Sequence, residues 1–225
     1  MKLTLASIAK DEEVFLPGML ESIKGLVDEV VLGVDDKTTD RTGQIATDYG
    51  AQTVFQFTWR NDFSYARNLA LDRATGDWTL VIDPDEAVTP HGVMVIKDIM
   101  ARDKAGQMPY HGFRFLEAQL DLDGTLQVVT PTSVRLFRNI PEIRYRGIVH
   151  EEPWDGRGES NWCDVAGVVV LTHMGYDPNV LYTKQKHERN LKLLQERIKL
   201  EPDNDYVRRK LASEMSMDEY GHEVK

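Results

Sequence analysis

The stretch WTLVIDPDE, residues 78–86, passes from an apolar run straight into three acidic side chains. "WTLVI" is typical of a buried strand, and Asp83, Asp85 and Glu86 follow it directly. Carboxylates one residue apart at a strand end project into the same crevice, where a hard divalent cation relieves their repulsion. The stretch therefore predicts a Mn²⁺ or Mg²⁺ site for a phosphate-bearing substrate. The alternative is a solvated turn in which Asp83 or Asp85 caps the next helix.

Three strand–helix units precede this stretch. Strand-like patterns at residues 2–9, 28–36 and 52–57 are followed by helix-like patterns at 16–27, 38–51 and 60–76. Thr39 or Asp40 is expected to cap the second helix and Asp62 the third, which we expect Gly76 to end. Such a series favours a mostly parallel sheet with helices on both faces. Ligands bind such sheets outside the carboxyl ends of the strands, where Asp35, Asp36 and the WTLVIDPDE acids fall.

The second half of the chain has a different texture. After a helical pattern at 89–103, short strand-like segments at 111–117, 126–129, 133–139, 143–152 and 165–176 predict mixed or antiparallel strands. From Asn179 onward the pattern is helical, and "EPDN" at 201–204 divides it into two helices. The tail is similar to one tetratricopeptide-like hairpin. We therefore expect one domain with halves at 1–100 and 101–178, and a helical extension at 179–225 through which the chain could form an oligomer.

Composition excludes several classes of function. The formal net charge of −10 repels a phosphate backbone and argues against a nucleic-acid partner. The single Cys163 rules out an internal disulfide framework. The longest apolar run, "VAGVVVL", is far shorter than the ~20 residues that span a bilayer, and no N-terminal signal pattern is present. We expect a cytoplasmic protein without a membrane span.

Several motifs in a fixed order carry a family resemblance. They are "AKDEE" (9–13), "VDDKTTDRT" (34–42), "WRNDFSYARNLALDRATGDWTLVIDPDE" (59–86), "RLFRN" (135–139), "RYRGIVHEE" (144–152) and "LTHMGY" (171–176). The chain resembles, over about residues 1–178, family 2 glycosyltransferases, in particular the bacterial subgroup with the pattern W-x-x-DFS-x-ARN-x-AL, whose members glycosylate lipopolysaccharide core or peptides.

The resemblance implies a fold and an activity. The fold would be GT-A, a Rossmann-like, mostly parallel α/β sheet with flanking helices, a small mixed or antiparallel sheet and a C-terminal helical extension. The activity would be metal-dependent, inverting transfer of a sugar from a nucleotide diphosphate sugar, most simply a UDP-sugar, to a saccharide or peptide acceptor. A non-catalytic nucleotide-sugar or protein-binding module on the same fold is the alternative. A nucleotidyltransferase is a weaker one, because "IAKDEE" lacks the glycines of a phosphate loop.

The resemblance also implies donor-binding residues. Ser7 and Glu12 match positions near the nucleotide, and Asp35 and Asp36 match the acidic pair that receives the base and ribose. Lys37 and Thr38 replace the small residues usual after that pair.

Arg67 and Asn68 match the family's "ARN", from which the forked donors of an arginine can reach a diphosphate. The alternative for Arg67 is a structural ion pair with Asp62 or Asp83.

The remaining assignments concern metal and catalysis. Asp83 and Asp85 match the family's metal-binding and donor-binding Asp-X-Asp. His173 matches a metal ligand found later in such chains, with His150 as the other candidate. Glu151 matches the general base of an inverting transfer, which takes the acceptor proton, and Glu152 is held in reserve.

Overall fold

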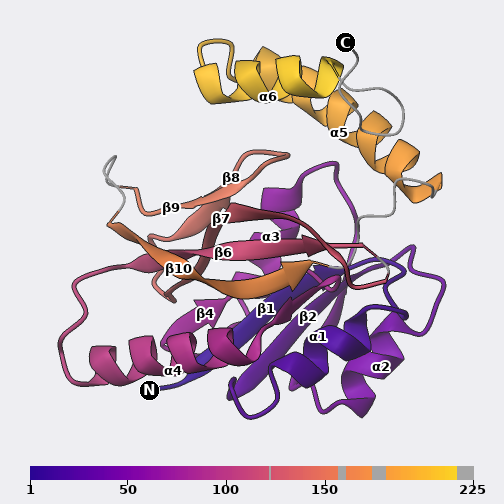
Figure 1. Ribbon diagram of the computed structural model, residues 1–225. Helices are drawn as coiled ribbons and strands as arrows, with labels where there is room; N and C mark the ends of the chain where they lie inside the picture. Colours follow the sequence, from indigo (N-terminus) through magenta and orange to yellow (C-terminus); the bar gives the residue numbers. More distant parts are fainter. Residues whose placement is uncertain (122, 157–160, 174–180, 217–225) are drawn as a thin grey trace.

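The computed structural model describes residues 1–121, 123–156, 161–173 and 181–216 (Figure 1). Its strands are β1 (Leu3–Ala9), β2 (Glu29–Asp35), β3 (Thr53–Phe57), β4 (Trp78–Leu80), β5 (Glu86–Val88), β6 (Gly112–Leu120), β7 (Leu126–Arg138), β8 (Arg144–Arg146), β9 (Glu152–Trp154) and β10 (Trp162–His173). Its helices are α1 (Leu16–Ser22), α2 (Thr42–Asp48), α3 (Phe63–Leu71), α4 (Pro90–Lys104), α5 (Leu181–Leu200) and α6 (Asp205–Met215).

One large sheet organises the domain, in the order β3-β2-β1-β4-β7-β6-β10-β5. The first four strands run parallel, as the three strand–helix units predict. β7 then pairs antiparallel with both β4 and β6, and β10 pairs parallel with β6 and antiparallel with β5. The sequence halves 1–100 and 101–178 therefore share a single sheet, and the carboxyl ends of β1, β2 and β4 meet at one edge.

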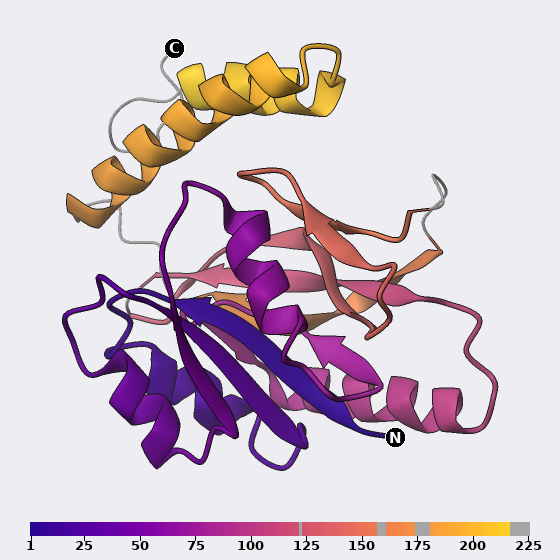
Figure 2. The ribbon, with the colours of Figure 1, turned by 180° about the vertical axis from the view of Figure 1, so that it is seen from behind.

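Alternating side chains of the central strands build two cores, one on each face. Leu3 and Leu5 of β1 face the larger core, which holds the apolar sides of α1, α2 and α4. Ala6 and Val31 face the other core, formed with α3 and the segment around β8. This period of two places helices on both faces (Figures 1 and 2). A mostly parallel α/β sheet, as predicted, is confirmed.

Several local predictions need correction. α3 is capped as expected, since Asp62 accepts a hydrogen bond from the Tyr65 amide at 2.9 Å, but it ends at Leu71 and not at Gly76. Gly76 instead packs tightly on β1, where an added Cβ would lie 2.6 Å from the Thr4 hydroxyl. α2 begins at Thr42, and neither Thr39 nor Asp40 is its N-cap.

The second half also differs in detail from the prediction. Residues 126–129 and 133–138 belong to one strand, β7, because both pair with β6 across local register shifts, and the strand ends one residue before Asn139. Residues 143–152 do not form one strand. β8 and β9 make a two-stranded antiparallel sheet in which Arg146 pairs with Glu152, and residues 147–151 form the loop between them. This small sheet lies on the α3 side of the large sheet (Figure 2).

The two C-terminal helices form a hairpin that packs on the domain (Figure 1). Leu193 and Leu194 of α5 and Val207 of α6 are buried with Val149 of the β8–β9 loop, and Trp59 and Phe63 flank them. The apolar side of the hairpin is thus covered by its own domain. Tetratricopeptide-like character and an oligomer formed through this segment stay predictions.

We expect Gly92→Ala to destabilise the fold although alanine favours helices. Gly92 lies in the first turn of α4, where an added Cβ would be 2.3 Å from the carbonyl oxygen of Val170 in β10. Overpacking of this kind costs about 1–3 kcal/mol of unfolding free energy, measurable by denaturant titration. Gly18→Ala in α1 is the matched control, because nothing lies within 4 Å of its added Cβ. Equal stability of the two variants would contradict this account of α4 packing.

Candidate active site

The turn after β4 brings Asp83 and Glu86 together at the carboxyl edge of the sheet. The Asp83 amide donates to the Glu86 carboxylate at 2.8 Å, and the Glu86 amide donates to the Asp83 carbonyl at 2.9 Å. The Ser7 hydroxyl of β1 donates to the Ile82 carbonyl at 2.7 Å and ties the turn to the central strand. The acidic residues therefore lie in an ordered turn that is held by specific hydrogen bonds.

A single buried guanidinium joins two of the predicted functional carboxylates. Arg67 Nη2 lies 2.8 Å from Asp83 Oδ1, and Arg67 Nε lies 2.5 Å from Glu151 Oε1. Arg67 is 8% exposed, and its Nη1 has no hydrogen-bond partner among the described residues. Burial opposes its charge, but Asp83 and Glu151 hold its pKa well above the ordinary arginine value. Arg67 thus takes the ion-pair role with Asp83 that the sequence left open, and contact with a diphosphate stays a prediction.

A second buried arginine, Arg135 of β7, completes the cluster. It pairs with Glu86 in a short contact and lies 3.7 Å from Asp83 Oδ2 and 3.8 Å from Glu117 Oε2. Burial raises the pKa of Asp83, but Arg67 and Arg135 outweigh it and bring that pKa below its ordinary range. Burial, with Asp83 and Glu117 nearby, raises the pKa of Glu86 well above the ordinary value despite Arg135. Its hydrogen bonds with the Asp83 backbone and its contact with Arg135 make Glu86 a structural residue of the turn.

Asp85 faces a different set of partners. His173 Nε2 of β10 lies 3.1 Å from Asp85 Oδ2, and Lys186 Nζ of α5 lies 3.5 Å from the same oxygen. His173 Nδ1 lies 2.5 Å from the side-chain oxygen Oε1 of Gln119, and the side-chain nitrogen Nε2 of Gln119 donates to the Glu117 carboxylate. This series of hydrogen bonds makes Nδ1 of His173 the donor to Gln119 and directs Nε2 toward Asp85. To interact favourably with the Asp85 carboxylate, Nε2 needs either a proton or a shared cation.

The carboxylate oxygens and the imidazole nitrogen around Asp85 are atoms of the kinds that bind divalent cations. Cis ligands at about 2.1 Å from Mg²⁺ lie about 3 Å apart, close to the separation of the Asp85 oxygen and the His173 nitrogen. Asp83 Oδ1 is bound by Arg67, while Oδ2 is beyond hydrogen-bond distance of Arg135. Within the described ranges, no group of three or more His, Cys, Asp or Glu side chains is placed so that it could hold one metal ion. Asp83, Asp85 and His173 as metal ligands therefore stay a prediction.

The loop between β8 and β9 points Glu151 inward and Glu152 outward. The Glu151 side chain is 11% exposed against Arg67, whereas Glu152 is exposed at the start of β9. His150, with φ of 49°, lies near Arg197 and Lys210 of the helical hairpin. Burial, with Lys210 and Arg197 nearby, lowers the pKa of His150 to about 4, so its ring is neutral at pH 7. Of the two candidate histidines, His173 is the one beside Asp85.

The other residues predicted to bind the nucleotide sugar lie near the same carboxyl edge of the sheet but differ in exposure. Asp35 is buried and accepts from the Lys37 amide at 2.9 Å, while Asp36 is exposed and accepts from the Thr58 hydroxyl at 2.5 Å. The half-buried Glu12 is in the loop after β1, where its amide donates to Thr42.

Asn68 lies on the side of α3 that faces β8, and its amide group makes two hydrogen bonds with the Tyr145 backbone. Asn68 thereby joins α3 to β8, and its part in donor binding stays a prediction.

Three residues of the site are not predicted from the sequence: Arg135, Glu117 and Gln119. Arg135 is within the quoted "RLFRN", and a charged residue inside an apolar strand pattern was the available signal, because a buried arginine needs carboxylate partners. Glu117 and Gln119 lie two residues apart on the same side of β6 and contact each other. Their partners in the site, Arg135 and His173, are on other strands, and no local pattern reveals them.

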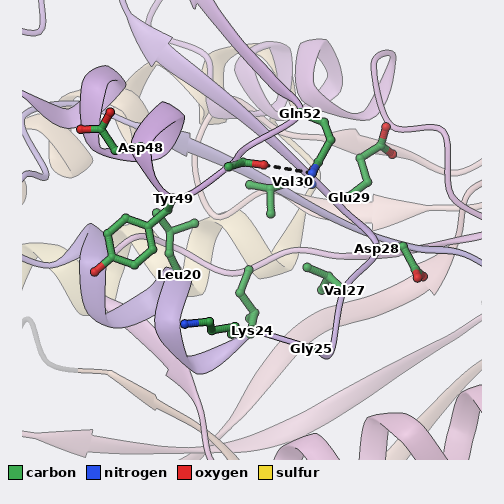
Figure 3. Close-up of a pocket in the computed structure, with 12 residues that line it drawn as sticks. Leu20, Lys24, Gly25, Val27, Asp28, Glu29, Val30, Asp48, Tyr49 and Gln52 are labelled. Atoms are coloured by element: carbon green, nitrogen blue, oxygen red, sulfur yellow. Dashed lines mark hydrogen bonds between the residues drawn. The ribbon is translucent and has the colours of Figure 1, made fainter.

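A cavity of about 390 Å³ lies elsewhere, near the amino end of β2 (Figure 3). Lys24, Asp28, Asp48 and Tyr49 are among its lining residues, and Gln52 accepts there from the Val30 amide at 2.6 Å. The chemistry described above is at the opposite, carboxyl end of the parallel strands. The candidate site is therefore the charged cluster, at the other end of the strands from this cavity.

The sheet order and the ion-paired acidic edge define a GT-A-like α/β domain. A family model for glycosyl transferase family 2 matches residues 5–117. A TPR repeat-containing protein of Synechococcus elongatus is 33% identical over 93% of this chain and 51% of its own length. The chain belongs to glycosyl transferase family 2. It spans about half the length of the curated relatives it matches.

Solved structures agree with the fold. S. aureus TarS 1-349 in complex with UDP-GlcNAc aligns with a TM-score of 0.53 at 17% identity, over 96% of this chain and 72% of that one. The mannosyltransferase PcManGT from Pyrobaculum calidifontis in complex with GDP-Man and Mn²⁺ aligns with a TM-score of 0.56 at 14% identity, over 95% and 68%. At these identities the likeness shows the GT-A fold alone. Across the residues described here, no helix combines the length and apolar character needed to cross a membrane.

We expect Arg67→Gln to lower the unfolding free energy by about 3–5 kcal/mol at pH 7, because it leaves the largely buried Glu151 without its partner and removes the nearer of the two arginines beside Asp83. The loss should shrink toward pH 5. The wild-type pKa of Asp83 is already below this window, whereas unpaired carboxylates in the variant can relieve their repulsion by taking up a proton. Denaturant titrations at both pH values measure this.

The matched control is Arg41→Gln, which removes an exposed pair with Glu13 and should change stability by less than about 0.5 kcal/mol. If Arg67→Gln resembles this control, or if its effect does not depend on pH, the central ion pair is not what holds the site together.

Proposed function

We propose that the chain transfers a sugar from a nucleotide diphosphate sugar to a saccharide or peptide acceptor, with inversion at the anomeric carbon. One observation carries the proposal. Arg67 brings Asp83, the predicted donor carboxylate, and Glu151, the predicted base, onto a single guanidinium at the carboxyl edge of the parallel strands. These residues are 84 positions apart at the extremes, so only this fold brings them together.

The donor would lie along the edge formed by β1, β2 and β4. Asp35 ends β2 and Asp83 follows β4, with β1 and its Ser7 between the two strands. Carboxylates accept hydrogen bonds from ribose hydroxyls and from a base imide, which suits Asp35 and Asp36 to the nucleoside. The likeness to a structure with bound UDP-GlcNAc supports a UDP-sugar as the first donor to test. Glu12, Arg67 and Asn68 are the other residues proposed to bind the nucleotide sugar.

Glu151 acts as the general base. As the acceptor oxygen attacks the anomeric carbon, the bond from that carbon to the diphosphate breaks, and a Glu151 carboxylate oxygen takes the acceptor proton. Arg67 holds Glu151 through Nε and leaves its second carboxylate oxygen outside that contact. Residues 101–178 supply Glu151 and would form the acceptor side of the domain.

Mn²⁺ or Mg²⁺ held by Asp83, Asp85 and His173 would neutralise the leaving diphosphate. Among the chain's own residues, Gln119 keeps His173 Nε2 directed at Asp85, and Lys186 lies beside the same carboxylate. The likeness to a structure with GDP-Man and Mn²⁺ supports this choice of cation.

We expect UDP binding to depend on the cation, because Asp83 and Asp85 otherwise face the diphosphate with like charge. Calorimetry should give tighter binding with Mn²⁺ than in chelator, by at least about tenfold, equivalent to about 1.4 kcal/mol. Asp85→Asn should remove most of that gain. Asp98→Asn, which removes an exposed α4 carboxylate, should leave it intact. Equal affinity with and without Mn²⁺ would eliminate the metal from the proposal.

We expect Glu151→Gln to lower transfer by about 10²–10⁴-fold while leaving UDP affinity nearly unchanged, because the amide keeps the shape and cannot take the proton. Glu152→Gln is the matched control and should have little effect, since that side chain is exposed. The readout is turnover with a panel of UDP-sugars and candidate acceptors. Tight nucleotide binding without turnover in the wild type would favour the alternative of a non-catalytic binding module.

A further inference from the structure

We propose that the α5–α6 hairpin is a working part of the active site, in which Arg197 is a positioning residue for Glu151. The inference rests on the proposed role of Glu151. It starts from the loop of residues 147–150, which leads directly into that residue between β8 and β9.

The loop has an unusual backbone that needs support from outside. Gly147 has φ of 97° and His150 has φ of 49°. A non-glycine residue in the left-handed region persists when its surroundings hold it there. Because His150 immediately precedes Glu151, the conformation of His150 sets the direction in which the Glu151 side chain leaves the backbone.

Arg197 of α5 supplies that support. Its Nη1 donates to the Val149 carbonyl at 2.6 Å and to the His150 carbonyl at 3.1 Å. Arg197 is 7% exposed, and its guanidinium packs against Gly147, where an added Cβ would lie 2.4 Å from Nη1. A glycine is therefore required at 147 both for its backbone angle and for room beside the guanidinium.

The hairpin in turn fixes Arg197. Glu201 accepts from Arg197 Nε at 3.0 Å, and the Asn204 side chain donates to Glu201 at 2.6 Å. Asn204 is also the N-cap of α6, accepting from the amides of Tyr206 and Val207. The turn between α5 and α6 thus orients the guanidinium that holds the loop.

The opposite side of the loop is held by α3, the helix that also carries Arg67. The Phe63 amide donates to the Ile148 carbonyl at 3.0 Å, and Val149 is buried against Leu193, Leu194 and Val207 of the hairpin. Glu151 is therefore fixed from two directions, by α3 through Arg67 and by α5 through the backbone before it. A passive cover would need the apolar contacts but not the two hydrogen bonds from a buried guanidinium.

The test compares the wild-type chain with Arg197→Gln, Arg197→Lys and the control Arg208→Gln. The Arg208 side chain is about half exposed in α6 and pairs only with Asp203 and Asp205 among the described contacts. Turnover of UDP-sugars and UDP affinity with Mn²⁺ are measured for each. Arg197→Gln should lower kcat by about 10- to 100-fold, as expected for a displaced catalytic group, with UDP affinity within about twofold of wild type. Arg197→Lys, which keeps a donor, should recover part of kcat.

Hydrogen exchange on the same proteins gives a readout that does not depend on activity. In Arg197→Gln the amides of residues 148–151 should exchange at least about tenfold faster, while those of α4 and the large sheet stay unchanged. Gly147→Ala should reproduce this effect and should not add to it in the double variant, because both changes remove the same contact.

The two sets of measurements separate the possible failures. If wild type neither binds nor turns over nucleotide sugars, the proposed function fails and hydrogen exchange still decides whether Arg197 holds the loop. If wild type is active and Arg197→Gln matches Arg208→Gln in kcat and in loop exchange, the hairpin is a passive cover and the inference is overturned. If Arg197→Gln loses hydrogen-exchange protection throughout the fold, Arg197→Lys becomes the deciding variant. Unchanged kcat and unchanged loop exchange in Arg197→Lys would then overturn the inference.

Discussion

The guanidinium of Arg67 is the contact on which the site depends. Glu151 is largely buried and Asp83 is partly buried at one sheet edge, so the two carboxylates repel each other and lose hydration. A shared arginine offsets both costs through directed, charge-assisted hydrogen bonds. Arg67 comes from α3, Asp83 from the turn after β4 and Glu151 from the β8–β9 loop. Three separate elements are therefore held in register by one side chain, and Arg135 repeats the arrangement for Asp83, Glu86 and Glu117.

The helical hairpin extends this network beyond the sheet. α5 approaches the site at two points, through Lys186 beside Asp85 and through Arg197 beneath the loop that carries Glu151. These residues are eleven positions apart, or about 16 Å along a helix. α5 thus lies along the site from the acidic turn to the proposed base. An apolar contact with Val149 holds it there, which explains why a segment with a polar average composition stays on the domain.

Charge balance explains how so many acidic residues share one edge. The clustered carboxylates are matched by Arg67, Arg135, His173 and Lys186, which reach them from α3, β7, β10 and α5. Asp83 is held below its ordinary pKa by its arginines, while the crowded Glu86 is raised above its own. The two acids are three residues apart, but Arg67 contacts Asp83 and not Glu86, and the side chain of Asp83 is the more exposed of the two.

The sequence by itself determined the class of fold and the location of the acidic edge. Strand and helix periods between residues 2 and 82 are local properties, and parallel strands must bring Asp35 and Asp83 to one side of the sheet. The family motifs likewise predicted Arg67, Asp85, Glu151 and His173 as residues of the site. What only the tertiary structure decided was their partners: Arg67 with both acids, His173 through Gln119, and Arg197 beneath Glu151. Those contacts join residues that are 16 to 84 positions apart, and no local propensity encodes which remote charge a buried side chain will meet.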